Sequence, residues 1–106
     1  MIIKRKDYGG VSFTPIDNNA IRDESVSLGA RGLLHYMLSC KEDWKFSVEG
    51  LCNGTNTKLA KLNTYLKELV RAGYLKKETK RDDKGKFLGF EWIVSEEPIL
   101  RDNELF

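Results

Sequence analysis

The sequence predicts a single α+β domain with three main helices and a small antiparallel β-sheet. An amphipathic run over residues 56–72 ends at Gly73, and two strand-like segments follow it around a polar turn near residues 81–86. The chain has 106 residues, of which 41% are hydrophobic and 32% charged, and this is enough for one hydrophobic core but too little for two. We expect residues 1–94 to form the domain and residues 95–106 to form an acidic tail or linker.

Two short elements are predicted ahead of the first long helix. Residues 11–14 alternate apolar and polar side chains before a proline, which suits a short edge strand. Asp17 or Asn18 can then cap a brief helical turn that runs to Arg22.

Residues 28–40 are predicted to form the main scaffold helix. Ser27 can cap this helix, and apolar side chains recur along it at helical spacing. Gly29 and Gly32 lie inside it, and each costs about 1 kcal/mol of helix propensity. Such a cost is usually accepted where another element packs close to the helix backbone.

A short helix and a longer one should follow. Ser47 can cap residues 48–52, and the Asn and Gly residues of segment 53–56 suit a tight turn because both tolerate positive φ. Asn56 or Thr57 should cap the longer helix. A short helix, a tight turn and a longer amphipathic helix together form the helix-turn-helix pattern.

The longer helix has one apolar and one polar side. Its leucines fall on a single stripe, which we assign to the core: Leu59, Leu62, Leu66 and Leu69. The side chains roughly opposite form a candidate reading face: Thr57, Ala60, Lys61, Thr64, Lys67, Glu68 and Arg71, with Asn63 on its flank. Glu68 would repel phosphate, so we expect it to pair with Arg71 or Lys67 at the margin of this face.

A β-hairpin is predicted directly after this helix. Gly73 is a natural residue to end the helix in the left-handed conformation. Residues 74–80 are predicted as an extended strand, and residues 87–94, rich in aromatic and β-branched side chains, as its return strand. Residues 83–85 between them have hairpin-turn chemistry. A helix that leads into a basic hairpin is the second half of a winged helix-turn-helix, in which the hairpin is the wing.

Positive charge is concentrated on this helix and hairpin. Residues 57–86 contain ten Lys or Arg against four acidic residues, whereas the formal net charge of the whole chain is only +2. A local excess of this kind indicates a polyanionic partner. The alternative is an ordinary solvated surface, because charged side chains are common on helix exteriors.

The residue types on this surface fit double-stranded DNA, which proteins hold by its phosphates and read at its base edges. Lys and Arg can neutralise phosphates, and short polar side chains near the helix N-terminus can reach base edges. The candidate DNA-binding residues are Asn56, Thr57, Lys58, Lys61, Asn63, Thr64, Lys67 and Arg71 on the helix, and Lys80, Arg81, Lys84 and Lys86 in the wing. The N-terminal segment Lys4-Arg5-Lys6 is either a flexible arm for the minor groove or a solvated chain end.

Other function classes lack the residues that they need. The sequence has no glycine-rich phosphate loop, HExxH or GxSxG motif, so we expect no enzyme and no small-molecule substrate. Cys40 and Cys52, with His35 as the only imidazole, favour neither a zinc site nor a redox motif, so we expect no metal and no cofactor. We expect His35 on the surface. No apolar stretch has signal-peptide or membrane-spanning length, which favours a cytoplasmic protein without a membrane partner.

Seven segments, taken in order, resemble a known family. They are residues 13–16, 21–23, 28–39, 43–47, 66–69, 72–75 and 85–87. Together they resemble the N-terminal winged-helix domains of phage and plasmid replication initiators and replisome organisers, found in Gram-positive bacteria and their mobile elements. The resemblance runs from Ile3 to about Pro98. It implies a winged helix that binds double-stranded DNA in replication initiation, with other replication proteins or a homodimer partner as further partners.

Two features depart from this family. Asp17 stands where such sequences often have a proline before the Asn, and the chain stops at Phe106, where such replication proteins usually continue into a second region. The chain is therefore either an excised domain or a free-standing DNA-binding module. Related winged helices also occur in transcriptional regulators, and a protein-interaction winged helix would use the same surface for an acidic protein. The tail is either a strap packed on the domain or a disordered linker.

Overall fold

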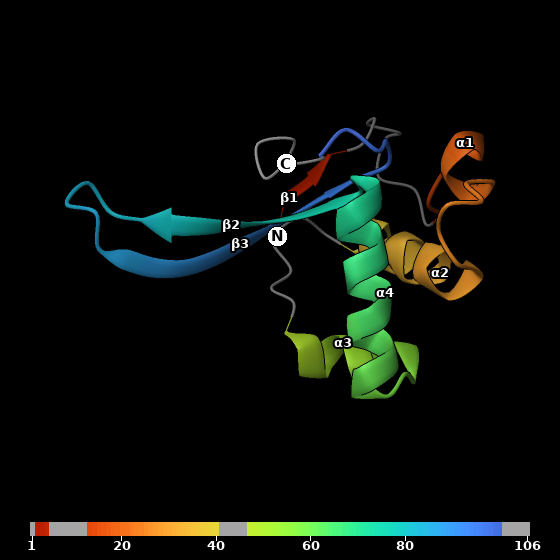
Figure 1. Cartoon of the computed structure of the whole chain (residues 1–106), viewed down its shortest axis with the longest axis horizontal. Coiled ribbons are helices and arrows are strands. Elements are labelled where there is room, and N and C mark those ends of the chain that lie inside the picture. Colours follow the sequence, from red (N-terminus) through yellow and green to blue (C-terminus); the bar gives the residue numbers. More distant parts are fainter. Residues whose placement is uncertain (1, 5–12, 41–46, 101–106) are drawn as a thin grey trace.

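The helices lie together on one side of the molecule, and a long β-hairpin extends away from them (Figure 1). The structure is a computed structural model, which describes residues 2–4, 13–40 and 47–100. Its elements, in chain order, are β1 (Ile2–Lys4), α1 (Asn18–Ile21), α2 (Leu28–Leu38), α3 (Val48–Thr55), α4 (Leu59–Ala72), β2 (Leu75–Arg81) and β3 (Phe87–Ser95). The predicted α+β class is confirmed.

The first three helices begin at the capping residues that the sequence predicts. The side chains of Asp17, Ser27 and Ser47 each accept a hydrogen bond from a backbone N–H in the first turn of α1, α2 and α3, respectively. These caps satisfy backbone donors that have no partner within the helix. At the other end of the motif, Gly73 terminates α4 with φ 94° in the left-handed conformation, as predicted.

The start of α4 differs from the prediction. Its N-cap is Lys58, which makes no side-chain capping hydrogen bond. Asn56 instead ends α3, with φ 52° and ψ 45° in the left-handed region. The predicted Asn56 or Thr57 cap is therefore wrong, because the tolerance of Asn for positive φ is used to close the preceding helix.

The described sheet has three strands in the order β1-β3-β2. β2 and β3 pair antiparallel along the hairpin, and β1 pairs parallel with the other edge of β3, with Ile2 opposite Ile93. A parallel pair needs a long crossover, and the helices between β1 and β3 supply it. The sheet is therefore mixed, and the prediction of a wholly antiparallel sheet is corrected.

The strand predicted at residues 11–14 is not the third strand of this sheet. Residues 11 and 12 lie outside the described part of the chain, and Phe13 and Thr14 are not in a strand. The apolar N-terminal segment Ile2–Lys4 takes the sheet edge instead. Sequence alternation missed this strand because a three-residue segment is too short to show a period.

The core lies between α2, α4 and the base of the hairpin. Leu34 and Met37 of α2 and Leu62 and Leu69 of α4 have no exposed surface. Leu59 was assigned to the same apolar stripe, but 57% of it is exposed. As the first residue of α4, it lies beyond the packed part of the helix.

The helix-propensity cost of Gly29 and Gly32 predicts that another element packs close to the backbone of α2. The structure shows such packing at one of the two glycines. A Cβ at Gly29 would overlap the ring of Tyr65, which reaches across from α4. A Cβ at Gly32 would meet no atom within 4 Å. The prediction of close packing is therefore confirmed at Gly29 and wrong at Gly32.

The beginning of the tail lies against the domain. β3 extends one residue past the predicted boundary, to a buried Ser95, and the N–H of Leu100 donates to the carbonyl oxygen of Gly73 at 2.8 Å. Ile99 is 62% exposed, so the backbone makes this attachment more than the apolar side chains do. As far as residue 100, the tail behaves as a strap, and residues 101–106 lie outside the described residues.

Candidate nucleic-acid interface

α4 presents a polar face to solvent. Six of its predicted DNA-binding residues are exposed: Lys58, Lys61, Asn63, Thr64, Lys67 and Arg71. The buried leucines on the other side of the helix fix its orientation. The Thr64 hydroxyl donates to the carbonyl oxygen of Ala60 at 3.1 Å, which leaves its oxygen able to accept a further hydrogen bond. The face therefore combines exposed cations with two short polar side chains.

The two predicted residues ahead of α4 belong to the turn. Thr57 is half-buried, its hydroxyl donates to the carbonyl oxygen of Thr55 at 3.2 Å, and the two threonine hydroxyl oxygens lie 3.0 Å apart. Asn56 is exposed, but its backbone closes α3. Thr57 is thus engaged within the protein, whereas the side chain of Asn56 remains accessible.

Glu68 does not pair with Lys67 or Arg71 as predicted. Its two carboxylate oxygens accept hydrogen bonds from the N–H and the hydroxyl of Ser27, at 2.9 and 2.8 Å. Ser27 caps α2, so Glu68 joins the start of that helix to α4. This contact joins residues 41 positions apart in the chain, which explains why helix periodicity could not predict it. It directs the one carboxylate of α4 away from the candidate reading face.

The four predicted wing cations have different surroundings. Lys80 forms an ion pair with Glu91 at 2.8 Å, and the guanidinium of Arg81 donates to the carbonyl oxygen of Gly85 at 3.1 Å. Lys84 and Lys86 are exposed in the loop that joins β2 to β3. They are therefore the wing cations best placed to meet phosphate, whereas Lys80 and Arg81 also support the hairpin.

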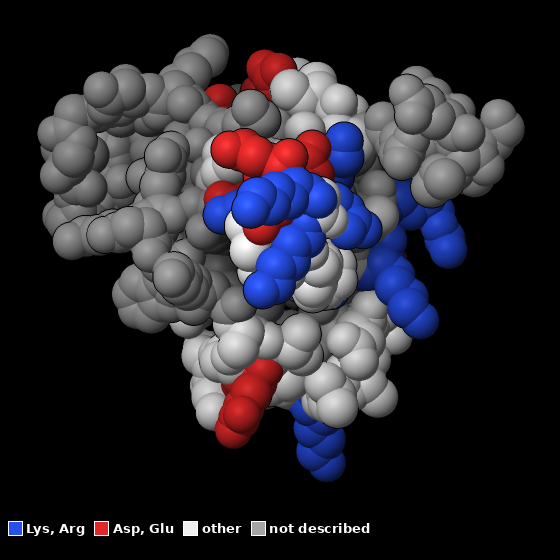
Figure 2. Space-filling model, turned by 90° about the vertical axis from the view of Figure 1, so that its left-hand side faces the viewer, with Lys and Arg blue, Asp and Glu red and all other residues white. Residues whose placement is uncertain are grey.

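The carboxylate of Asp82 holds the wing loop. One of its oxygens accepts hydrogen bonds from the N–H groups of Lys84 and Lys86, at 2.9 and 2.8 Å. Gly85 adopts φ 82°, a conformation that L-residues rarely adopt. These interactions position the two lysines at the end of the hairpin. Figure 2, which faces this end, shows Lys and Arg gathered beside Asp and Glu, with further Lys and Arg along one edge of the molecule.

The segment proposed as a minor-groove arm lies partly in the sheet. Lys4 is the last residue of β1 and pairs with Ser95 of β3. A flexible arm beginning at Lys4 is therefore excluded. Arg5 and Lys6 lie outside the described residues.

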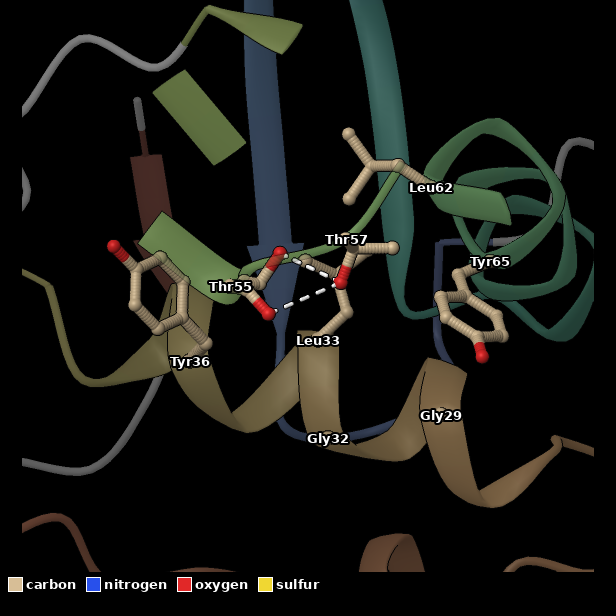
Figure 3. A pocket seen from close by; sticks show the side chains of 8 residues that line it. All are labelled: Gly29, Gly32, Leu33, Tyr36, Thr55, Thr57, Leu62 and Tyr65. Atoms are coloured by element: carbon tan, nitrogen blue, oxygen red, sulfur yellow. Dashed lines mark hydrogen bonds between the residues drawn. The ribbon is translucent and has the colours of Figure 1, made fainter. Parts of the chain in front are cut away.

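A cavity of about 370 Å³ opens between α2, the end of α3 and the start of α4 (Figure 3). It is lined by Gly29, Gly32, Leu33, Tyr36, Thr55, Thr57, Leu62 and Tyr65. None of these side chains carries a charge at neutral pH, so the lining offers no charged anchor for a phosphate or a carboxylate. The cavity therefore adds nothing to the polar face of α4.

The pKa values of two titratable groups, Asp23 and His35, are shifted by their surroundings. The hydroxyls of Ser25 and Tyr74 donate to the Asp23 carboxylate, each at 2.6 Å, and together they lower its pKa. His35 is half-buried rather than on the surface as predicted, and its Nε2 has no hydrogen-bond partner among the described residues. Burial, aided by the charge of Arg31, lowers the pKa of His35.

Sequence reasoning missed one exposed feature of the wing. Phe87 and Phe90 are about half exposed, and their ring centroids lie 5.2 Å apart. The ammonium group of Lys77 lies over two rings, 4.1 Å from the centroid of Phe90 and 5.3 Å from that of Trp92. The aromatic richness of β3 was the available signal, but it predicted a strand and not a surface.

Comparison of the chain with protein families, characterised proteins and solved structures gives no match. Within the described residues, no three His, Cys, Asp or Glu side chains are placed to hold a metal ion. The helices in that part of the chain are also too short or too polar to cross a membrane. The site must therefore be interpreted from its own geometry and charge.

Proposed function

We propose that this chain is a winged helix-turn-helix domain that binds double-stranded DNA in a sequence-specific manner. In this proposal α3 and α4 form the helix-turn-helix, α4 enters the major groove, and the β2–β3 hairpin is the wing. Asn63 and Thr64 contact base edges, while Lys61, Lys67 and Arg71 on the helix and Lys84 and Lys86 in the wing contact phosphates.

One observation carries the proposal: the polar face of α4 is exposed, and the hairpin that follows α4 in the chain ends in exposed lysines. Lys61, Lys67 and Arg71 on this face are open to solvent, so their charges are available to neutralise phosphates. The hydrogen bonds of Glu68 with Ser27 further support it, because they hold against the start of α2 the one carboxylate of α4, which would otherwise oppose phosphate.

The biological process is proposed from the sequence resemblance. The segments that resemble replication initiators and replisome organisers cover both the helices and the hairpin, so we place the domain in replication initiation of a phage, plasmid or other mobile element. Such a protein acts in the cytoplasm. A transcriptional regulator would use the same DNA-binding surface, and the target sequence distinguishes the two roles.

A protein-interaction domain is the rival from another class, and it would require an apolar patch on α4. Leu59 and Val70 are exposed, at 57% and 47%. Because they are eleven positions apart on a helix that rises about 1.5 Å per residue, they lie about 16 Å from one another along its axis. They therefore do not form a single patch, which favours the DNA-binding alternative.

The dependence of duplex binding on salt tests the proposal. If helix and wing neutralise about four to six phosphates, a plot of log K against log salt concentration should have a slope of roughly −4 to −5. Fluorescence anisotropy of a labelled duplex measures this slope. A slope near zero would refute DNA binding by this surface.

A further inference from the structure

The hairpin has one face that the proposed duplex binding does not use. This aromatic face consists of Lys77, Arg81, Phe87, Phe90 and Trp92. Trp92 is half-buried and packs against the core, whereas Phe87 and Phe90 are 50% and 52% exposed. Two half-exposed phenyl rings in mutual contact, beyond the edge of the core, form a surface that the stability of the domain does not explain.

A local irregularity of the hairpin creates this face. Residues three apart in a regular strand lie on opposite faces, so Phe87 and Phe90 would normally be separated. The register shifts at Arg81, which pairs with Phe87 although Lys80 pairs with Gly89, and Gly89 has φ 124°. The additional residue in β3 is a β-bulge, and it returns Phe87 to the side of Phe90.

The two faces of the hairpin differ in charge. The pairing of β2 with β3 places Glu78 opposite Glu91, on the face that also carries Lys76 and Lys80. There the charges compensate one another through the ion pairs of Lys76 with Glu78 at 3.3 Å and of Lys80 with Glu91 at 2.8 Å. Both carboxylates of the two strands are thus on that face. The aromatic face carries positive charge without a strand carboxylate.

We propose that the aromatic face binds single-stranded nucleic acid, with unpaired bases stacking on Phe87 and Phe90 and phosphates meeting Lys77 and Arg81. Aromatic rings set among cations are the surface on which single strands bind without strict sequence preference. Bases within a duplex are already stacked on one another and do not present their faces. The charge argues against a second copy of the chain, because a symmetric contact would bring two copies of this positively charged face together.

The test uses the full chain and a fluorescein-labelled oligothymidylate of about 12 nucleotides, a length that spans one such site. Phe90→Leu should weaken binding in an anisotropy titration at low salt by about ten-fold, because stacking on one ring is lost. Phe90→Tyr should retain the affinity of the parent chain. Phe13→Leu, which changes an exposed ring outside the hairpin, is the matched control and should change oligothymidylate binding by less than about two-fold.

Other outcomes overturn the proposal. One is that the parent chain binds no oligothymidylate, and another is that Phe90→Leu binds it as tightly as the parent chain does. A third contradicting outcome is that Phe90→Leu and Phe90→Tyr lose the same amount of affinity. Sedimentation equilibrium also tests whether the chain forms a dimer. If Phe90→Leu dissociated such a dimer and left oligothymidylate binding unchanged, the face would instead be the contact with a second copy of the chain. Circular dichroism melting curves verify that each variant is folded. The inference does not depend on the proposed duplex binding. A chain that shows no salt-dependent binding to a duplex can still bind oligothymidylate, so the two titrations test the two proposals separately.

Discussion

The exposed side chains of α4 and the wing belong to two chemical classes, which should respond differently to mutation. Short polar side chains such as Asn63 and Thr64 can discriminate between base pairs. Lysines at the end of the hairpin, such as Lys84, attract phosphate whatever the sequence. Mutation of the short polar side chains should therefore lower sequence specificity, whereas mutation of the lysines should lower affinity for all sequences.

Thr64→Ala or Asn63→Ala should lower the discrimination between a preferred duplex and a scrambled one by about 1 kcal/mol. Lys84→Ala should weaken both duplexes about equally and flatten the salt slope by about one unit. Anisotropy titrations of both duplexes at several salt concentrations measure both effects. If Lys84 controlled specificity and the α4 variants did not, the wing would be the reading element.

The Tyr74 hydroxyl provides a prediction about stability and pH. It is buried and donates to Asp23, whose pKa is lowered by Ser25 and Tyr74. Tyr74→Phe should reduce the free energy of unfolding at pH 7 by about 1 kcal/mol. Because the pKa of Asp23 is lower in the folded state, this contribution is present above the unfolded pKa and is lost as the pH falls through the folded one.

Urea denaturation of the two proteins between pH 7 and pH 3 measures this difference. The difference in free energy of unfolding between the parent chain and Tyr74→Phe should be largest at pH 7. It should decrease as Asp23 becomes protonated. A difference that stays constant down to pH 3 would show that the Tyr74 hydroxyl stabilises the fold independently of the charge on Asp23.

At the level of elements, local signals in the sequence located most helix ends but did not reveal contacts between distant segments. Ser27, Ser47 and Gly73 mark helix ends because the residues that satisfy a helix terminus are its neighbours in the chain. The β1 strand could not be predicted in this way, because its partner Ile93 lies at the other end of the sequence. Glu68 was misassigned for the same reason.

The candidate site was predictable to the extent that it follows helix periodicity. The exposed face of α4 agrees with the 100° spacing of its residues, apart from Thr57 in the turn and Glu68 against Ser27. The aromatic face of the hairpin does not follow the two-residue period of a strand, because the β-bulge changes the side on which Phe87 lies. The two-residue alternation of a strand therefore could not predict the aromatic face.

Gly89 should be essential for the shape of the hairpin. At φ 124° a side chain is strained, so Gly89→Ala should lower the free energy of unfolding by about 1–3 kcal/mol. Gly32→Ala is the matched control, because Gly32 is in the interior of a helix with open space at its Cβ, and it should stabilise the protein by about 0.4–1 kcal/mol. Chemical denaturation measures both. If Gly89→Ala left the free energy of unfolding unchanged, the β-bulge at this position would be contradicted.

At the level of the whole molecule, the helices provide a rigid support for two surfaces. The core between α2, α4 and the hairpin base fixes how α4 is presented, and the sheet carries the hairpin away from the helices (Figure 1). The contact of Leu100 with Gly73 brings the tail to the junction of α4 and β2. For the proposed function, this arrangement must read a specific sequence in double-stranded DNA.

Selection of bound sequences from a random duplex pool, with the full chain as bait, tests that claim most directly. We expect enrichment of a defined motif, which Thr64→Ala degrades and Lys84→Ala leaves unchanged in sequence while lowering the yield. The motif would also identify the target. Recovery of a pool with no enriched motif after repeated rounds, from a chain that remains folded, would contradict sequence-specific duplex recognition by α4.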